Sequence, residues 1–321
     1  MGEEILIAGA GAIGSVFGAM LRRAGHRVAL LGRPAHLEAI ARAGLRIGGI
    51  FGEHIVRGFD LADDPARLRG RFGLILCAVK SYDTAAMAGV IAERIADDGI
   101  VVSLQNGLGN LEALAARLGP GRILGGRVIF GAEFVKPGAV RVTVFAEPVA
   151  IGPDPALGGD AAQSLAARAR EIATLIAAAG IPTVAVDDIE PVLWAKVLYN
   201  AALNPLGALH GLAYGELAAD PDLRAIMDDA IGEAFAVASR LGVKLPYPNA
   251  AAYRDIFYGR LVPVTAGHRP TMLYDLKNRG RTEIDALNGK VAELAARLGI
   301  AAPVNRTLTR MVHAAERLRK R

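Results

Sequence analysis

The chain has 321 residues, 52% of them hydrophobic and 21% charged, a composition that excludes a disordered protein. Its single cysteine, Cys77, excludes a disulfide framework and a zinc site built from several cysteines. There is no apolar run long enough to span a membrane and no signal-peptide pattern at the start, and the net charge of +5 is spread along the chain. We therefore expect a cytoplasmic globular protein that binds neither membranes nor nucleic acids.

Strands and helices alternate in the first half of the sequence. Short apolar segments predict strands at 5–8, 27–31, 74–79 and 100–104, and helical periodicity predicts helices at 12–24, 35–43, 84–95 and 108–118. Residues 128–151 are strand-like around a Pro137-Gly138 turn, and residues 161–179 are helical. This alternation is typical of an α/β fold with a doubly wound, Rossmann-type parallel sheet.

The strand pattern ends near Val186. Helices are predicted after it at 189–209, 221–241, 250–260, 270–279, 285–298 and 305–319, with Gly and Pro residues between them. The sequence therefore predicts two domains. A Rossmann-type dinucleotide-binding domain covers residues 1–187, and an all-helical domain covers residues 188–321, where we expect the substrate contacts and the contacts of any homodimer.

A glycine-rich segment, Gly9-Ala10-Gly11-Ala12-Ile13-Gly14, follows the first predicted strand and opens the first predicted helix. Gly9 allows a tight turn, Gly11 lets the backbone approach a pyrophosphate, and Gly14 lets the helix pack close to the strand. The helix N-terminus then faces the anion. A tight turn without a ligand is the alternative, and the strand–turn–helix context favours a dinucleotide.

The end of the second predicted strand indicates which dinucleotide binds. An NAD site places Asp or Glu there to bind the ribose hydroxyls. The strand ends instead in Leu31-Gly32-Arg33-Pro34, without an acid. Arg33 can pair with a 2′-phosphate, so the sequence favours NADP over NAD. The alternative is that Arg33 is an ordinary surface arginine.

Two polar residues stand at the carboxyl ends of later strands. Lys80 ends the predicted strand at 74–79, and Asn106 follows the strand at 100–104. Doubly wound sheets bind ligands at this edge. Plain turn chemistry is the alternative for both residues, and their shared position favours a site.

A predicted apolar helix carries the next candidate site. Lys196, Asn200 and Asn204 lie at i, i+4 and i+8, on one face of the helix at 189–209. Only seven of the 37 basic residues are lysines, and a lysine can release a proton near neutral pH whereas an arginine cannot. Burying these groups is costly unless each finds a partner. They form either a polar network between helices or, as we favour, a substrate pocket in which Lys196 gives a proton.

Several motifs together resemble the ketopantoate reductases, or 2-dehydropantoate 2-reductases, over essentially the whole chain. They are Gly9-Ala10-Gly11-Ala12-Ile13-Gly14, Val79-Lys80-Ser81, Gln105-Asn106-Gly107, Trp194-Ala195-Lys196, Asn204-Pro205-Leu206, Pro270-Thr271-Met272 and Thr282-Glu283-Ile284-Asp285. The resemblance implies NADPH-dependent reduction of 2-dehydropantoate to (R)-pantoate, in the pathway to pantothenate and coenzyme A. The substrate would be a small 2-oxo acid.

The resemblance also implies roles for individual residues. Lys196 would bind the substrate and donate the proton, and the other substrate contacts would come from Asn106, Asn200, Asn204 and Thr271. Asn106 would touch both the cofactor and the substrate. The glycine-rich segment, Arg33 and Lys80, which the residues themselves indicate, are the other expected cofactor contacts. Glu283 would lie beside the cofactor and near Lys196, and Ala132 would lie near the nicotinamide. From the residues alone, Thr282 to Asp285 could equally be a helix capping box.

Two positions depart from the family pattern. Tyr214 and His268 stand where asparagines that contact the substrate are expected. Both positions lie where the acyl tail of the substrate should be recognised. A different branched 2-oxo acid, or an imine-forming opine reaction, is therefore an alternative. A non-catalytic NADP-sensing regulator is a further alternative. Such a regulator would need the glycine turn and Arg33 but not Lys196, which argues against it.

Overall fold

The computed structural model of the chain describes residues 3–158 and 161–319. The outermost residues of the predicted domains, 1–2 and 320–321, therefore lie outside the described residues. The chain forms two compact units. The N-terminal unit comprises Met1–Gln105 and Asn110–Ile189, and the C-terminal unit comprises Asn106–Gly109 and Glu190–Arg321. A short loop of the first half of the sequence thus belongs to the C-terminal unit.

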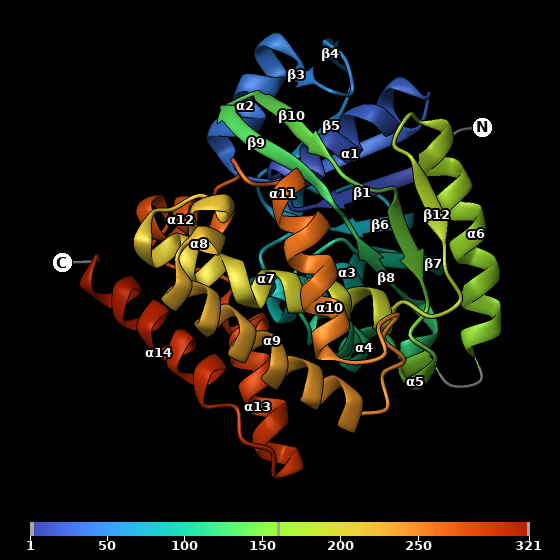
Figure 1. The fold of residues 1–321 in the computed structure, drawn as a ribbon. Coiled ribbons are helices and arrows are strands. Elements are labelled where there is room, and N and C mark those ends of the chain that lie inside the picture. The colour runs from blue at the N-terminus through green and yellow to red at the C-terminus, as the bar shows by residue number, and fades with distance from the viewer. Residues whose placement is uncertain (1–2, 159–160, 320–321) are drawn as a thin grey trace. The chain divides into compact units, whose positions relative to one another are not determined.

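The N-terminal unit is built on an eight-stranded sheet in the order β12-β11-β8-β7-β6-β1-β2-β5 (Figure 1). Its strands are β1 (Glu4–Ala8), β2 (Arg27–Leu31), β5 (Asp60–Ala62), β6 (Phe72–Cys77), β7 (Ile95–Ser103), β8 (Ile123–Arg127), β11 (Val149–Gly152) and β12 (Thr183–Ala185). Neighbouring strands are parallel except for β8 and β11. The strand order reverses at β1, which pairs with both β2 and β6. Ligands of doubly wound sheets bind at such a reversal, and the predicted Rossmann-type fold is confirmed.

Helices connect the strands, as the parallel pairing requires. They are α1 (Ala12–Arg23), α2 (Pro34–Ala43), α3 (Thr84–Arg94), α4 (Asn110–Leu118), α5 (Pro155–Gly158) and α6 (Ala162–Ala178). Short 3₁₀ turns occur at Pro65–Arg67, Ser81–Asp83 and Pro120–Arg122. Strand β6 ends at Cys77, not at Val79 as predicted, so Lys80 lies in the turn after the strand.

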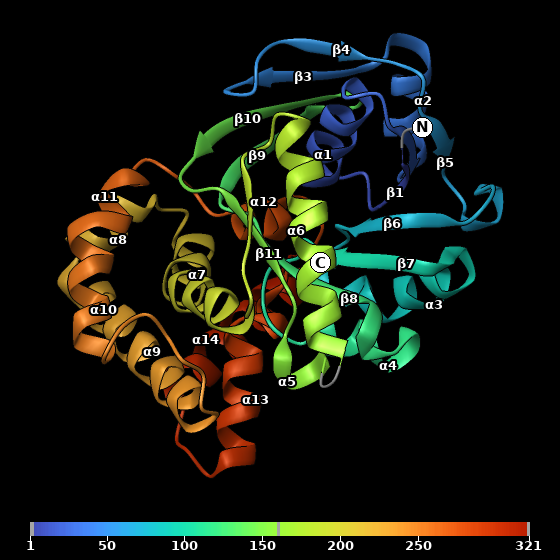
Figure 2. The same cartoon turned by 90° about the vertical axis from the view of Figure 1, so that its right-hand side faces the viewer.

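A second sheet, which the sequence did not predict, contains β3 (Leu45–Gly49), β4 (His54–Val56), β9 (Phe130–Lys136) and β10 (Ala139–Phe145). Its order is β4-β3-β10-β9. Helix α1 packs against both sheets, and Figure 2 shows it between β1 and β10. The predicted strand-like segment 128–151 is therefore divided between two sheets.

A buried histidine joins α1, α2 and the second sheet. His36 is 3% exposed; its Nε2 lies 3.0 Å from the Ser15 hydroxyl, and the Gly138 N–H donates to its Nδ1 at 2.9 Å. Because Nδ1 accepts, the proton of the neutral ring is on Nε2, which donates to Ser15. Burial lowers the pKa of His36 to about 4, so the ring is neutral at pH 7.

The part of the C-terminal unit that the structure describes is helical. Its elements are α7 (Glu190–His210), α8 (Tyr214–Ala219), α9 (Pro221–Arg240), α10 (Ala250–Ile256), a π-helical turn (Phe257–Leu261), α11 (Val262–Val264), α12 (Thr271–Asn278), a 3₁₀ turn (Ile284–Ala286), α13 (Asn288–Leu298) and α14 (Pro303–Leu318). Helix α7 packs against α8, α9, α12 and α14, with Trp194, Leu198 and Leu203 in the core. The unit thus encloses an apolar helix that carries polar residues. No helix in 3–158 or 161–319 is long and apolar enough to cross a membrane.

Candidate active site

The glycine-rich turn has the backbone shape of an anion cradle. Gly9 has φ +108°, and a Cβ there would lie 2.7 Å from the Val79 nitrogen. A Cβ on Gly14 would lie 2.2 Å from the Gly9 carbonyl oxygen, so helix α1 approaches the turn closely. A Cβ on Gly11, in contrast, would meet nothing within 4 Å, and the first turn of α1 has no side-chain cap. Open space before uncapped N–H groups fits a dinucleotide pyrophosphate.

The rest of the segment adjoins the turn between β2 and α2. Ala10 is buried, and its Cβ would lie 2.8 Å from a Cβ on Gly32; Ala12 and Ile13 are half-buried at the start of α1. Arg33 directly follows Gly32 as the exposed N-cap of α2, and among the described residues it forms no ion pair. Its guanidinium is therefore available to an anionic ligand near the glycine-rich turn.

A buried glutamine, which was not among the predicted site residues, organises the neighbouring turns. Gln105 Nε2 donates to the Val79 carbonyl at 3.0 Å and to the Thr84 hydroxyl at 2.7 Å. Its Oε1 accepts from the Ser103 hydroxyl at 3.0 Å and from the Cys77 thiol at 3.5 Å. Burial raises the pKa of Cys77 to about 12, so the thiol keeps its proton and remains a donor. The only sequence signal for this network is a glutamine at the end of an apolar strand.

Val79 and Gln105 lie next to two predicted site residues. Lys80, half-buried, is the N-cap of the 3₁₀ turn at Ser81–Asp83. Asn106 opens the loop that belongs to the C-terminal unit, where the Leu108 N–H donates to the Ala286 carbonyl at 2.8 Å. Gly107 has φ +85°, and a Cβ there would lie 2.4 Å from the same carbonyl oxygen. This close approach places Asn106 in the unit that holds Lys196 and Glu283.

Helix α7 carries the predicted polar face. Lys196, Asn200 and Asn204 all lie in its continuous helical turns, so their four-residue spacing sets them on one face. Lys196 and Asn204 are half-buried and Asn200 is 8% exposed. Within the described chain, the Asn200 side-chain amide has no hydrogen-bond partner. A mostly buried amide without a protein partner favours a ligand-binding face over a closed polar network.

The two residues that depart from the family pattern lie beside this face. The Tyr214 hydroxyl donates to Asn204 Oδ1 at 2.8 Å. The rings of Tyr214 and His268 meet edge to face with centroids 5.2 Å apart, and the Tyr214 N–H donates to the His268 carbonyl at 3.0 Å. Burial raises the pKa of Tyr214 well above its ordinary value, so its hydroxyl is un-ionised.

The remaining predicted residues divide between the two units. Thr271 is exposed at the start of α12, and Glu283 is 9% exposed just before the 3₁₀ turn at Ile284–Ala286. The Thr282 N–H and hydroxyl donate to Glu316 Oε1 at 2.7 and 2.8 Å, and the Glu283 side chain does not cap the 3₁₀ turn. A capping box would instead pair the Thr282 N–H with Asp285, so this segment is not a capping box. Ala132 lies half-buried in β9, in the N-terminal unit.

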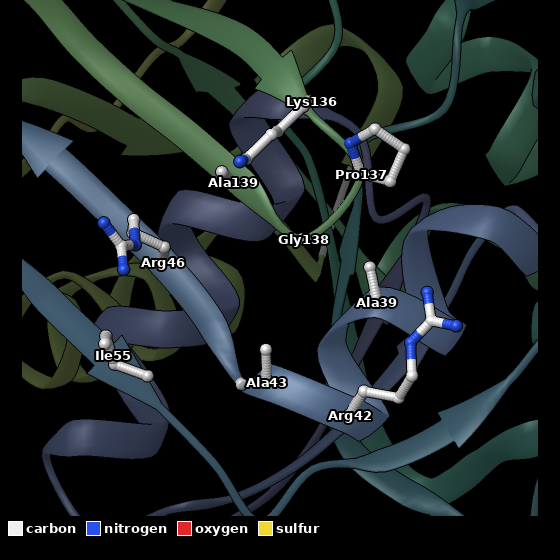
Figure 3. Close-up of a pocket in the computed structure, with 10 residues that line it drawn as sticks. Ala39, Arg42, Ala43, Arg46, Ile55, Lys136, Pro137, Gly138 and Ala139 are labelled. Carbon is white, nitrogen blue, oxygen red and sulfur yellow. The ribbon is translucent and has the colours of Figure 1, made fainter.

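A cavity of about 420 Å³ in the N-terminal unit contains none of these residues. In Figure 3 the Lys136 and Arg46 side chains lie across the cavity from Arg42. It is lined by Ala39, Arg42, Ala43, Gly44, Arg46, Ile55, Lys136, Pro137, Gly138 and Ala139. The cavity is thus separate from the candidate active site. No cluster of three or more potential metal-ligating side chains occurs in the described ranges.

Known proteins match this chain over almost its whole length. Residues 5–155 match the family "Ketopantoate reductase PanE/ApbA", and residues 188–316 match its C-terminal part. The chain is 37% identical over 315 residues to the 2-dehydropantoate 2-reductase of Aquifex aeolicus, covering 98% of this chain and 97% of that protein. The family resemblance inferred from the sequence is confirmed.

Solved structures extend the comparison. A PanE/ApbA family ketopantoate reductase from Ralstonia eutropha JMP134 is 34% identical, with a TM-score of 0.85, and the match covers 99% of this chain and 100% of that one. A D-mandelate dehydrogenase in a ternary structure with NADH and anilino(oxo)acetate is 25% identical, with a TM-score of 0.87 and the same coverage. The fold is therefore shared by a ketopantoate reductase and a D-mandelate dehydrogenase.

Proposed function

We propose, since the chain belongs to the ketopantoate reductase family, that it reduces 2-dehydropantoate to (R)-pantoate with NADPH. The observation that carries the proposal is the polar face of α7. Lys196 and Asn204 flank a mostly buried Asn200 amide that has no partner among the described residues. Full-length relatives named 2-dehydropantoate 2-reductase support this substrate. The product would enter pantothenate and coenzyme A synthesis.

The pyrophosphate and the 2′-phosphate of the cofactor would be held by residues of the N-terminal unit. The open space at Gly11 and the uncapped start of α1 suit the pyrophosphate, and the exposed Arg33 suits the 2′-phosphate of NADPH. Lys80, Asn106, Ala132 and Glu283 complete the proposed cofactor contacts. When bound, NADPH supplies the hydride that reduces the carbonyl carbon of the substrate.

Lys196 would complete the reduction. As an ammonium group it donates a hydrogen bond to the substrate carbonyl oxygen, where negative charge develops, and then transfers its proton to that oxygen. The alcohol forms and Lys196 is left neutral, to be reprotonated from solvent. Asn106, Asn200, Asn204 and Thr271 would hold the carboxylate and the hydroxyl of the substrate, which fixes the orientation of the carbonyl.

A second candidate function is the reduction of a different 2-oxo acid, one with an aromatic tail that could stack on neighbouring rings. The specific observation in its favour is the ring of Tyr214, flanked by Tyr199 and His268, at the end of the polar face. The similar D-mandelate dehydrogenase was solved with NADH and anilino(oxo)acetate, which carries an aromatic ring. This alternative keeps the proposed role of Lys196 and changes only the tail of the substrate.

Product analysis tests the proposal. The purified protein is incubated with NADPH and 2-dehydropantoate, NADPH oxidation is followed by absorbance, and the product is resolved on a chiral column. We expect (R)-pantoate in one-to-one ratio with oxidised cofactor. Oxidation only with an aryl 2-oxo acid would support the second candidate, and no oxidation with either acid would contradict both. A cytoplasmic location and a homodimer are further parts of the proposal.

A further inference from the structure

We propose that Tyr214 is a positioning residue, whose hydroxyl holds the Asn204 amide so that its Nδ2 amino group is presented to the substrate. The inference rests on the proposed function, in which Asn204 contacts the 2-oxo acid. Tyr214 itself need not touch the substrate. Its role would be to determine which end of the Asn204 amide, Oδ1 or Nδ2, contacts the substrate.

The hydrogen bond between the two side chains determines the amide orientation. Tyr214 is 4% exposed, and its hydroxyl donates to Asn204 Oδ1 at 2.8 Å. If the amide were flipped, the hydroxyl would face Nδ2, a donor, and its own proton would lose the acceptor that Oδ1 provides. A buried donor without an acceptor is strongly disfavoured. The Tyr214 hydroxyl therefore selects the conformer in which Oδ1 faces Tyr214 and Nδ2 faces away.

The Tyr214 ring is itself held on several sides. It meets the Tyr199 ring edge to face at 5.8 Å and the His268 ring at 5.2 Å. Its backbone N–H donates to the His268 carbonyl at 3.0 Å, and the next N–H, of Gly215, donates to the Ala266 carbonyl at 2.8 Å. Burial keeps the hydroxyl un-ionised by raising the pKa of Tyr214, so it remains a donor across the physiological range. The ring is therefore a fixed support for Asn204.

This arrangement restricts the chemistry that Asn204 can recognise. With Oδ1 turned toward Tyr214, the amide presents its Nδ2 N–H donors on the opposite side, so a substrate atom on that side must be an acceptor. A carboxylate oxygen or a hydroxyl oxygen of the 2-oxo acid meets this requirement. An ammonium or amide N–H group at the same place does not, which disfavours amino-bearing 2-oxo acids.

The test compares two hydroxyl deletions in one aromatic cluster. Tyr214→Phe removes the bond to Asn204, whereas Tyr199→Phe removes a hydroxyl that lies 2.5 Å from Thr265 Oγ1. For the 2-oxo acid that the wild-type enzyme reduces best, we expect Tyr214→Phe to raise KM about threefold to tenfold, the range for one net hydrogen bond. The kcat should change less than KM, and Tyr199→Phe should leave KM within about twofold.

A double mutant separates a positioning role of the Tyr214 hydroxyl from a merely structural role. In the Asn204→Ala background, Tyr214→Phe should add no further rise in KM, because the amide that it orients is absent. Should Tyr214→Phe fail to fold, Asn204→Asp carries the test: its carboxylate still accepts from Tyr214 but cannot donate, so KM should rise at least about tenfold.

The outcomes are distinct for this inference and for the proposed function. Equal KM values for Tyr214→Phe and wild type, or additive effects of Tyr214→Phe and Asn204→Ala, would overturn the positioning role while leaving the reductase function intact. A wild-type protein that oxidises NADPH with no 2-oxo acid would overturn the proposed function and this inference with it.

Discussion

Asn288 donates a hydrogen bond from Nδ2 to the carbonyl oxygen of Ala201, 2.9 Å away in the middle of helix α7. In a regular helix that carbonyl would accept from the N–H of residue 205, which is Pro205 and has no N–H. Asn288 is fully buried and also donates to Asn305 Oδ1 at 3.0 Å. A side chain of α13 thus replaces the backbone donor that α7 lacks, immediately beside Asn204.

Removing this donor should destabilise the protein. Asn288→Ala leaves a buried carbonyl unpaired, and we expect the free energy of unfolding to fall by about 1–3 kcal/mol. Urea denaturation measures the change. The matched control is Asn278→Ala, which removes an exposed asparagine that donates to the Tyr274 carbonyl and should cost no more than about 0.5 kcal/mol. Equal losses for the two variants would show that Asn288 does not repair the helix.

Arg33 gives a prediction about cofactor choice. Arg33→Ala should weaken NADPH binding by about 1.5–3 kcal/mol, the value of a hydrogen bond to a charged group, and should change NADH binding little. Arg42→Ala, at the other end of α2, should leave both affinities near the wild-type values. Titration calorimetry with each cofactor provides the measurement. If Arg33→Ala weakened NADPH and NADH equally, Arg33 would not bind the 2′-phosphate.

His36 makes stability depend on pH. Burial lowers its pKa in the folded protein from 6.5 to about 4. Between these values the unfolded chain binds more protons, so the free energy of unfolding falls as the pH falls through this window. The contribution of His36 to this loss is on the order of 3 kcal/mol at most. Protonation would also remove the bond that Nδ1 accepts from the Gly138 N–H.

Denaturation at several pH values tests this role. His36→Gln can still accept from Gly138 and donate to Ser15 but does not titrate. Between about pH 7 and pH 4.5 the variant should therefore lose less stability than wild type. Parallel pH profiles for the two proteins would mean that His36 does not cause the acid sensitivity.

Much of the fold follows from sequence pattern, because short continuous apolar runs such as 5–8 and 74–79 are typical of parallel strands that are buried on both faces. The second sheet does not follow. Its strand Leu45–Gly49 contains two glycines, which are uncommon in strands. Its strand His54–Val56 has only three residues, too few to show an alternating apolar and polar pattern. The end of β6 was also missed, because the turn at Val79 is set by its approach to Gly9, a tertiary contact.

The candidate site divides in the same way. Helical spacing was sufficient to place Lys196, Asn200 and Asn204 on one face, since it depends only on the helix period. The contact between Tyr214 and Asn204 depends on the unpredicted helix α8, and the network around Gln105 joins residues from separate strands and turns. Contacts of this kind are set by packing and leave no local signal.

Lys196 gives the prediction about chemistry. Lys196→Ala should lower kcat by at least about 10²-fold, the lower end for a lost general acid, while NADPH binding is retained. Lys196→Arg keeps the positive charge but cannot release a proton near neutral pH, so it should not restore kcat. Lys277→Ala, which removes an exposed lysine of α12, should behave as wild type. Activity of Lys196→Ala within a few fold of wild type would exclude Lys196 as the proton donor.

The ratio of kcat/KM for 2-dehydropantoate to that for 2-oxoisovalerate tests the proposed function most directly. The two acids differ by the hydroxymethyl group, and a site that hydrogen-bonds a hydroxyl discriminates strongly against an analogue that lacks it. Asn204 Nδ2, held by Tyr214, is a donor available for that hydroxyl oxygen. We predict that 2-dehydropantoate is favoured by more than about 10²-fold with NADPH as reductant. Comparable values for the two acids would contradict the assignment of 2-dehydropantoate as the substrate.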